Sequence, residues 1–293
     1  MKTLPDLEKH ALELVRLAST QLPADIVEAL ERGRDAEAEG SAARATLDTV
    51  LENIAMAAEA STPICQDTGT PIFYVRHPWD HPTAPMREAM TAAVREATAR
   101  SYLRPNAVDS VTGANSGDNS GDHFPAFYFE QWDRKDEVRV DLMLKGGGSE
   151  NQGIQYSLPD RDLGAGRDLD GVRKAVLDAL VRAQGHGCGP AVVGVCIGGD
   201  RGGSIAVAKR QILRPLAHRN PDATLAALED ELHARANELG IGPMGFGGAT
   251  TVLGVKIAKA HRLPASFFVS VVYMCWAARR HAMTIKAGEV SYD

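Results

Sequence analysis

The spacing of apolar residues near the amino terminus predicts helices. Apolar residues recur every three or four positions over 7–17, again after Pro23, and once more over 42–59. This interval places them on one face of an amphipathic helix. The first sixty residues, 1–60, are therefore expected to form a helical N-terminal part.

Further along the chain, short apolar runs alternate with helical patterns. Strands are expected over 72–75, 125–131, 137–145, 191–197, 251–257 and 266–272, and helices over 86–99, 169–184, 204–213 and 221–240. Strands that alternate with helices favour layered sheets flanked by helices. The predicted fold class is α/β, with mixed sheets following the helical N-terminal part.

Two local features refine this expectation. The runs 125–131 and 137–145 are close enough to form a strand pair, with Asp136 in the turn between them. The longest apolar run, 266–278, predicts a strand that ends near Cys275 and continues into a helix. No internal repeat or linker interrupts the chain, so residues 1–293 are expected to form a single domain.

Composition excludes several classes of protein. The 293 residues include 32 basic and 38 acidic side chains, which gives a formal net charge of −6, and 44% of them are hydrophobic. This composition is ordinary for a globular protein, and its acidity argues against a nucleic-acid partner. No apolar run reaches the roughly 20 residues of a membrane span, and the charged amino terminus does not resemble a signal peptide. A cytoplasmic protein with reduced thiols is expected.

The four cysteines raise the central question of chemistry. They stand at positions 65, 188, 196 and 275 without a CxxC pair, and a chain of this size does not need disulfide bonds. Cys196 lies inside an apolar run, where a buried thiol is expected. The other three lie where strands or helices end. At a helix start the pKa of Cys275 would be lowered, which favours ligation, although a buried structural thiol remains the alternative.

Three polar or glycine-rich segments contain or accompany these cysteines. Residues 64–70 (Ile-Cys-Gln-Asp-Thr-Gly-Thr) can present a thiolate with hydrogen-bonding groups, but an ordinary turn explains all of them except the cysteine. Residues 145–151 (Lys-Gly-Gly-Gly-Ser-Glu-Asn) can bring backbone N–H groups and Lys145 to a carboxylate, with a mobile loop as the alternative. Residues 185–190 place Cys188 on a glycine-framed loop.

Taken together, the three loop cysteines favour an iron–sulfur cluster over zinc, because zinc normally takes four ligands with closely paired spacing. A cluster with three cysteine ligands leaves one iron open to act as a Lewis acid. That arrangement is typical of a dehydratase.

Several ordered motifs resemble a known family. They are 65–70, Tyr102-Leu103-Arg104, 115–119, 145–151, 188–190, 197–199 and 275–277. In these motifs the chain resembles the class I, iron–sulfur-dependent fumarate hydratase and L-tartrate dehydratase family, along the α subunit or N-terminal domain, from the N-terminal helices to Arg280. The resemblance implies that family's N-terminal-domain fold and the reversible hydration of fumarate to (S)-malate, a reaction of the tricarboxylic acid cycle.

The resemblance also implies roles for individual residues. Cys65, Cys188 and Cys275 would hold a [4Fe-4S] cluster whose open iron binds the hydroxyl and a carboxylate of malate, a small dicarboxylate. The implied substrate-binding residues are Gln66, Asp67, Arg104, Lys145, Gly148 and His261. Asp67 is expected to act as acid and base, and Arg104 to bind a substrate carboxylate. The match at His261 is displaced, because the position twelve residues before the third cysteine is Leu263.

A partner chain is also expected. Single-chain members of the family continue into a C-terminal domain that contributes further arginine, threonine and lysine contacts, and this sequence stops at Asp293. The resemblance therefore implies a separate β subunit in an α2β2 or similar heteromer, and little activity of this chain alone. An L-tartrate dehydratase α subunit and a non-catalytic cluster-binding relative are the alternatives. The glycine run and residues 197–200 favour the fumarate hydratase branch.

Overall fold

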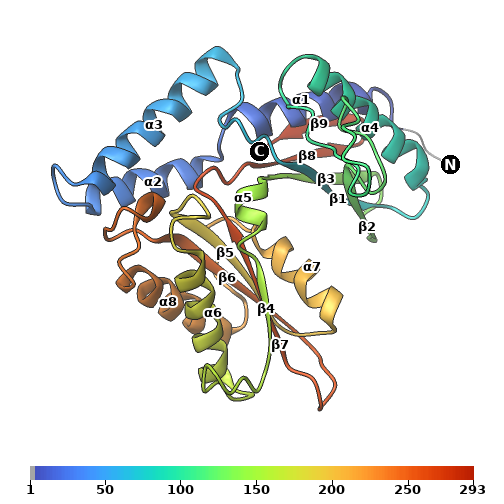
Figure 1. The fold of residues 1–293 in the computed structure, drawn as a ribbon. Coiled ribbons are helices and arrows are strands. Elements are labelled where there is room, and N and C mark those ends of the chain that lie inside the picture. Colours follow the sequence, from blue (N-terminus) through green and yellow to red (C-terminus); the bar gives the residue numbers. More distant parts are fainter. Residues whose placement is uncertain (1–3) are drawn as a thin grey trace. The chain divides into compact units, whose positions relative to one another are not determined.

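The chain packs into two compact units, which are described separately below. The computed structural model describes residues 4–293 (Figure 1). Unit 1 contains the residues up to Pro23, Glu52–Gly147 and Ala277–Asp293, and unit 2 contains Ala24–Leu51 and Gly148–Trp276. None of the helices in this described part of the chain is long and apolar enough to cross a membrane.

Unit 1 is built on a mixed five-stranded sheet. Its strand order is β2 (Ala126–Gln131), β1 (Thr70–His77), β3 (Glu137–Lys145), β8 (Arg280–Lys286) and β9 (Glu289–Tyr292). Only β1 and β2 run parallel, and the other neighbours are antiparallel. In this register Thr70, at the start of β1, lies opposite Lys145, at the end of β3.

Two helices cover one face of this sheet. They are α1 (Leu7–Thr20) and α4 (Thr83–Ala99), and their apolar stripes follow the helical period. The buried side chains that form this core include Ala11, Leu14, Ala18, Met90, Val94, Phe73, Val140, Leu142 and Met283. This packing fixes the start of β1 and the adjoining end of β3, where the segment 64–70 ends.

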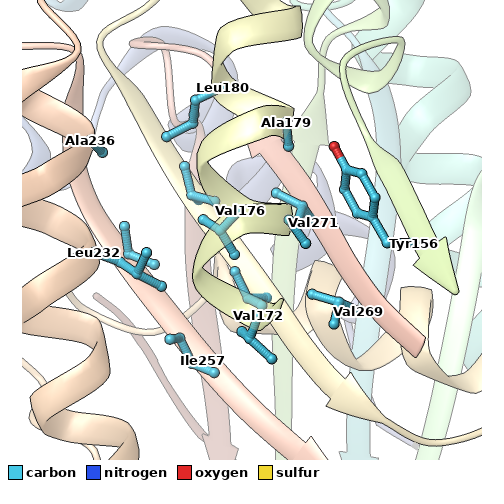
Figure 2. Close-up of a cluster of buried hydrophobic side chains, with 14 of the residues drawn as sticks. Tyr156, Val172, Val176, Ala179, Leu180, Leu232, Ala236, Ile257, Val269 and Val271 are labelled. Atoms are coloured by element: carbon cyan, nitrogen blue, oxygen red, sulfur yellow. The ribbon is translucent and has the colours of Figure 1, made fainter. Parts of the chain in front are cut away.

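Unit 2 contains a four-stranded sheet in the order β4 (Ile154–Ser157), β7 (Phe268–Met274), β5 (Ala191–Gly198) and β6 (Val252–Ala260). Strands β5 and β6 are parallel, whereas β7 is antiparallel to both β4 and β5. Figure 2 shows the core on one face, where α6 (Leu169–Ala183) and α8 (Ala223–Glu238) lay valines and leucines on the sheet.

Helix α7 (Arg201–Gln211) packs on the opposite face of this sheet. A Cβ at Gly194 of β5 would lie 2.2 Å from the carbonyl oxygen of Ala208 in α7, and neighbouring strand residues alternate between faces.

Aspartates cap three helices of unit 2. The side chains of Asp168, Asp200 and Asp222 accept hydrogen bonds from backbone N–H groups at the amino ends of α6, α7 and α8. Unit 2 also holds α2 (Ala24–Ala36) and η1 (Pro243–Gly245).

Two elements lie across the sequence boundaries between the units. They are α3 (Ala42–Ala60) and the one-turn helix α5 (Gly147–Glu150). The α/β class with mixed sheets is confirmed, and α1, α2 and α3 form the helical N-terminal part within 7–60; residues 1–3 of the predicted 1–60 lie outside the described residues. The single domain 1–293 stays a prediction.

Two predictions, one about strand pairing and one about a helix, are wrong. The runs 125–131 and 137–145 do not pair with each other, because β1 lies between β2 and β3 and bonds to both. No helix follows Cys275: residues 275–279 are irregular and the chain enters β8 at Arg280. Pairing of β8 with β3 over seven positions overrides the local preference of the Cys-Trp-Ala-Ala-Arg-Arg segment.

Candidate functional site

Asp67 is oriented by backbone groups in unit 1. Its Oδ1 accepts a hydrogen bond from the N–H of Gly69 at 3.0 Å, and its Oδ2 accepts one from Gly147 at 2.7 Å. Gly69 has φ +79°, and a Cβ there would lie 2.7 Å from the carbonyl carbon of Lys145, so the turn requires glycine. The carboxylate is exposed, and is thus both fixed and accessible to a small molecule.

Gln66 and Arg104 lie beside this carboxylate. Both residues are exposed, and Nη1 of Arg104 donates to the carbonyl oxygen of Gln66 at 3.4 Å. The backbone N–H of Arg104 donates to Oγ1 of Thr68 at 3.0 Å. The Arg104 guanidinium therefore lies against the backbone of the segment that carries Gln66 and Asp67, and a guanidinium is well suited to bind a carboxylate with two parallel hydrogen bonds.

Lys145 is placed differently from these three residues. It is the last residue of β3, and only 1% of its surface is exposed. Gly147 and Gly148, the second and third glycines after it, begin α5 instead of a mobile loop, and the Gly147 N–H is the donor that binds Asp67. The glycine run thus helps to orient the carboxylate.

Two of the predicted cluster cysteines are close together in unit 2. Cys188 precedes β5 and Cys275 directly follows β7, whose end lies opposite the start of β5. The backbone N–H of Trp276 donates to the carbonyl oxygen of Cys188 at 3.0 Å. The two cysteine-bearing loops are therefore joined directly, although they are far apart in sequence.

The ring of Tyr273 packs against the loop that carries Cys188. A Cβ at Gly187 would lie 2.3 Å from its ring, so the loop approaches the ring as only glycine allows. Burial, and then the nearby Cys275 and Cys188 sulfurs, raise the pKa of Tyr273. The phenol is thus neutral beside the two cysteines at ordinary pH.

Exposure divides the four cysteines. Cys65, Cys188 and Cys275 are half-buried, Cys196 is buried, and none forms a disulfide. Burial raises the pKa of the Cys196 thiol. Cys65, in unit 1, follows Ile64, whose N–H donates to the carbonyl oxygen of Ser19 at 3.0 Å. Half-buried thiols have the ligand chemistry of an iron–sulfur cluster. Within residues 4–293, no group of three or more His, Cys, Asp or Glu side chains, these cysteines included, is gathered closely enough to hold a metal ion.

Gly148 and His261 lie at opposite ends of unit 2. A Cβ at Gly148 would lie 3.9 Å from the carbonyl oxygen of His186, two residues before Cys188. His261 follows the end of β6, beside Gly198 at the end of β5, whereas Cys188 precedes the start of that strand. The length of a strand, on the order of 25 Å, therefore separates His261 from Cys188. The structure does not bring His261 to the cysteines of its own unit.

The sequence interpretation missed Arg279 in unit 1. Its side chain is 1% exposed, and its buried Nε and Nη1 atoms have no hydrogen-bond partner. A Cβ at Gly146 would lie 3.5 Å from Nη2 of Arg279 and 3.0 Å from Oδ2 of Asp67. Both atoms therefore lie close to Gly146. Arginine is rarely fully buried, and no local pattern in the sequence marks this one.

Replacing this buried guanidinium should stabilise the fold. We expect Arg279→Met to raise the free energy of unfolding by about 1–3 kcal/mol, because a buried cation with unpaired N–H groups is costly to desolvate. Urea denaturation of the purified chain measures the change. Arg279→Lys, which keeps the charge, is the control and should bring no gain. A loss of more than about 1 kcal/mol in Arg279→Met would contradict this expectation.

Comparisons with known proteins identify the family of the chain. A family model described as fumarate hydratase (Fumerase) matches residues 8–284. The chain is 48% identical over 289 residues to a Geobacillus stearothermophilus protein named "Putative fumarate hydratase class I". That match covers 97% of this chain and 56% of the relative, so the chain spans little more than half the relative's length.

Two further relatives are matched along nearly their full length. A Methanocaldococcus jannaschii protein named "Putative L(+)-tartrate dehydratase subunit alpha" is 35% identical over 279 residues, which are 94% of this chain and 96% of the relative. The Escherichia coli K12 "L(+)-tartrate dehydratase subunit alpha" is 32% identical over 274 residues, 92% and 88% of the two chains. By the extent of these matches, the chain belongs to the fumarate hydratase (Fumerase) family.

Proposed function

We propose that this chain is the α subunit of an iron–sulfur hydro-lyase that interconverts fumarate and (S)-malate in the cytoplasm. The observation that carries the proposal is the exposed Asp67 carboxylate, held by two backbone N–H groups beside Gln66 and Arg104. A dicarboxylate that must lose or gain a proton at carbon needs a base and a carboxylate-binding group side by side. Family membership supports the same reaction class.

The residues divide the work as follows. Arg104 binds one carboxylate of the substrate, and the Gln66 side chain donates or accepts a further hydrogen bond. Asp67 removes the proton from the carbon next to the hydroxyl-bearing carbon of malate, and returns it when fumarate is hydrated. Each carboxylate oxygen of Asp67 has a second lone pair, so it can take the proton while it keeps its bonds to Gly69 and Gly147. Lys145, opposite Thr70 at the end of β3, adds positive charge, and the backbone of Gly148 is a further expected contact of the substrate.

The cofactor in this proposal is a [4Fe-4S] cluster on Cys65, Cys188 and Cys275. Their thiols are half-buried, in contrast to Cys196, and the Trp276–Cys188 hydrogen bond couples two of their loops. When bound, the cluster supplies a Lewis acid at its open iron, which assists departure of the hydroxyl group. His261, at the far end of its unit's sheet, has no role in this proposal.

A separate β subunit completes the proposed enzyme. The relatives from M. jannaschii and E. coli are named alpha subunits, and the matches cover 96% and 88% of their lengths. The longer G. stearothermophilus relative has room for a second part of similar size, since this chain spans 56% of it. An α2β2 heteromer is one assembly consistent with both patterns.

The same comparison supports a second candidate substrate. The two relatives whose length this chain most nearly matches are named for L(+)-tartrate dehydration, although the relative with higher identity is named for fumarate hydration. Both substrates are hydroxylated dicarboxylates or their dehydration products, so Asp67 and Arg104 would have the same tasks in either reaction.

One experiment separates these candidates. The chain is co-expressed with its candidate β subunit, reconstituted with iron and sulfide without oxygen, and assayed on fumarate, (S)-malate and L(+)-tartrate. We expect kcat/KM for malate to exceed that for tartrate by at least about 100-fold, and the chain without its partner to be nearly inactive. A preference for tartrate would favour the second candidate. No turnover of any substrate by the reconstituted complex would contradict both.

A further inference from the structure

The loop 106–123 of unit 1 contains a motif, 115–119, to which the proposed function gives no role. Its last residue, Asn119, is 1% exposed and has φ +59°. Asparagine is one of the few residues with a side chain that readily adopts this left-handed conformation. A buried amide group in such a conformation needs an explanation from its contacts.

The side chain of Asn119 makes four hydrogen bonds. Its Oδ1 accepts from the backbone N–H groups of Asn106, at 2.7 Å, and Ala107, at 3.2 Å. Its Nδ2 donates to the carbonyl oxygen of Arg104 at 2.7 Å and to Oγ1 of Thr98 at 2.9 Å. Because an N–H can only donate and a carbonyl can only accept, the backbone partners fix the orientation of the amide.

Three of these four bonds reach the backbone of one short segment, 104–107. The same segment is held from its other side by Thr68, whose Oγ1 accepts from the Arg104 N–H and from Nδ2 of Asn106, both at 3.0 Å. Thr68 directly follows Asp67 in the chain. The backbone from which the Arg104 side chain extends is therefore bonded on one side to the Asp67 segment and on the other to Asn119.

We propose that Asn119 is a positioning residue for Arg104, which it holds at a fixed distance from Asp67 for carboxylate binding. This inference rests on the proposed function of Arg104. Without the Asn119 amide, the Arg104 carbonyl and two N–H groups lose their partners, and the segment is freed to move. The Arg104 side chain would then spend less time in the conformation that binds the substrate carboxylate. The affinity for substrate should therefore fall more than the rate of the chemical step.

The test is a double-mutant cycle in the complete α–β complex. Asn119→Gly keeps the φ +59° backbone, since glycine tolerates it. We expect KM for malate to rise about 10-fold in Asn119→Gly and about 100-fold in Arg104→Met. If Asn119 acts through Arg104, the double variant stays near 100-fold, whereas independent effects multiply to about 1000-fold. A multiplied effect would overturn the proposal.

Thr98→Val is the matched control. It removes the one partner of Asn119 that lies outside the 104–107 segment, so it should lower thermal stability as Asn119→Gly does, yet leave KM within about 2-fold. A purely structural role predicts equal changes in KM for the two variants, and that result would also overturn the proposal.

Hydrogen exchange gives a readout that does not depend on turnover. The amides of Asn106 and Ala107 should exchange faster in Asn119→Gly than in Thr98→Val, because only the first variant removes their acceptor. Equal exchange in the two variants would contradict the positioning role. A wild-type complex that does not turn over malate would instead contradict the proposed function, so the two failures are distinguishable.

Discussion

Replacing Asp67 by asparagine should lower kcat for malate dehydration by about 1000-fold, within the range by which a general base accelerates proton transfer. The amide is isosteric but accepts a proton poorly. One of its two ends is an NH₂ group that would face an N–H donor of Gly69 or Gly147, so the variant should also lose about 1–3 kcal/mol of stability. Steady-state kinetics and thermal unfolding of the reconstituted complex measure the two effects.

Asp109→Asn is the matched control for this substitution. Asp109 is also exposed in unit 1, and its carboxylate accepts from the backbone N–H groups of Val111 at 3.0 Å and Thr112 at 2.6 Å. It should also lower thermal stability and keep kcat within about 2-fold, because Asp109 holds a turn and has no role in the proposed reaction. If Asp67→Asn keeps more than about a tenth of the wild-type kcat, Asp67 is not the base.

Changing each cysteine to serine should separate three of them from the fourth. Cys65→Ser, Cys188→Ser and Cys275→Ser should each lose most of the iron and sulfide taken up by the wild-type chain, because a neutral hydroxyl replaces a thiolate ligand. Cys196→Ser should take up the full amount, since this residue is buried in β5 and faces α7. Iron and sulfide analysis after anaerobic reconstitution, together with visible absorbance, measures uptake.

Cys196→Ser also controls for damage to the fold. It places a hydroxyl in a buried position beside Ser204 and should lower stability by about 1–2 kcal/mol, comparable to or greater than the loss in the half-buried cysteine variants. Equal loss of iron from all four variants would refute the assignment of ligands. A colourless wild-type protein after reconstitution would refute the cluster itself.

Regular periodicity made part of the fold predictable from the sequence. Helix α3 was expected over 42–59 and ends one residue later, and β3 has the expected bounds. Strand β4, with four residues, is too short to show an alternation. The order of strands depends on long-range pairing, which places β1 between β2 and β3. Neighbouring runs in the sequence carry no signal for such an inserted strand.

The candidate site was predictable to a different extent. The Gln66–Asp67 pair and Arg104 could be recognised because they lie in motifs that resemble the family, whereas turn chemistry alone explains Gln66 and Asp67. The contacts that hold them could not, because Asn119 bonds to a segment more than ten residues away. The buried Arg279 near Gly146 is likewise not marked by any local pattern. Hydrogen-bond partners distant in sequence leave no local pattern.

The division of the chain has a consequence for biosynthesis. Unit 2 is complete once Trp276 has been made, whereas the sheet of unit 1 still awaits β8 and β9 from Ala277–Asp293. Until residues 277–293 leave the ribosome, the hydrogen-bonding edge of β3 that β8 will occupy has no strand beside it. Domains generally fold as their sequence becomes available. Unit 2 can therefore begin to fold once Trp276 has left the ribosome, whereas the unit that carries Asp67 and Arg104 matures only after β8 and β9 have followed.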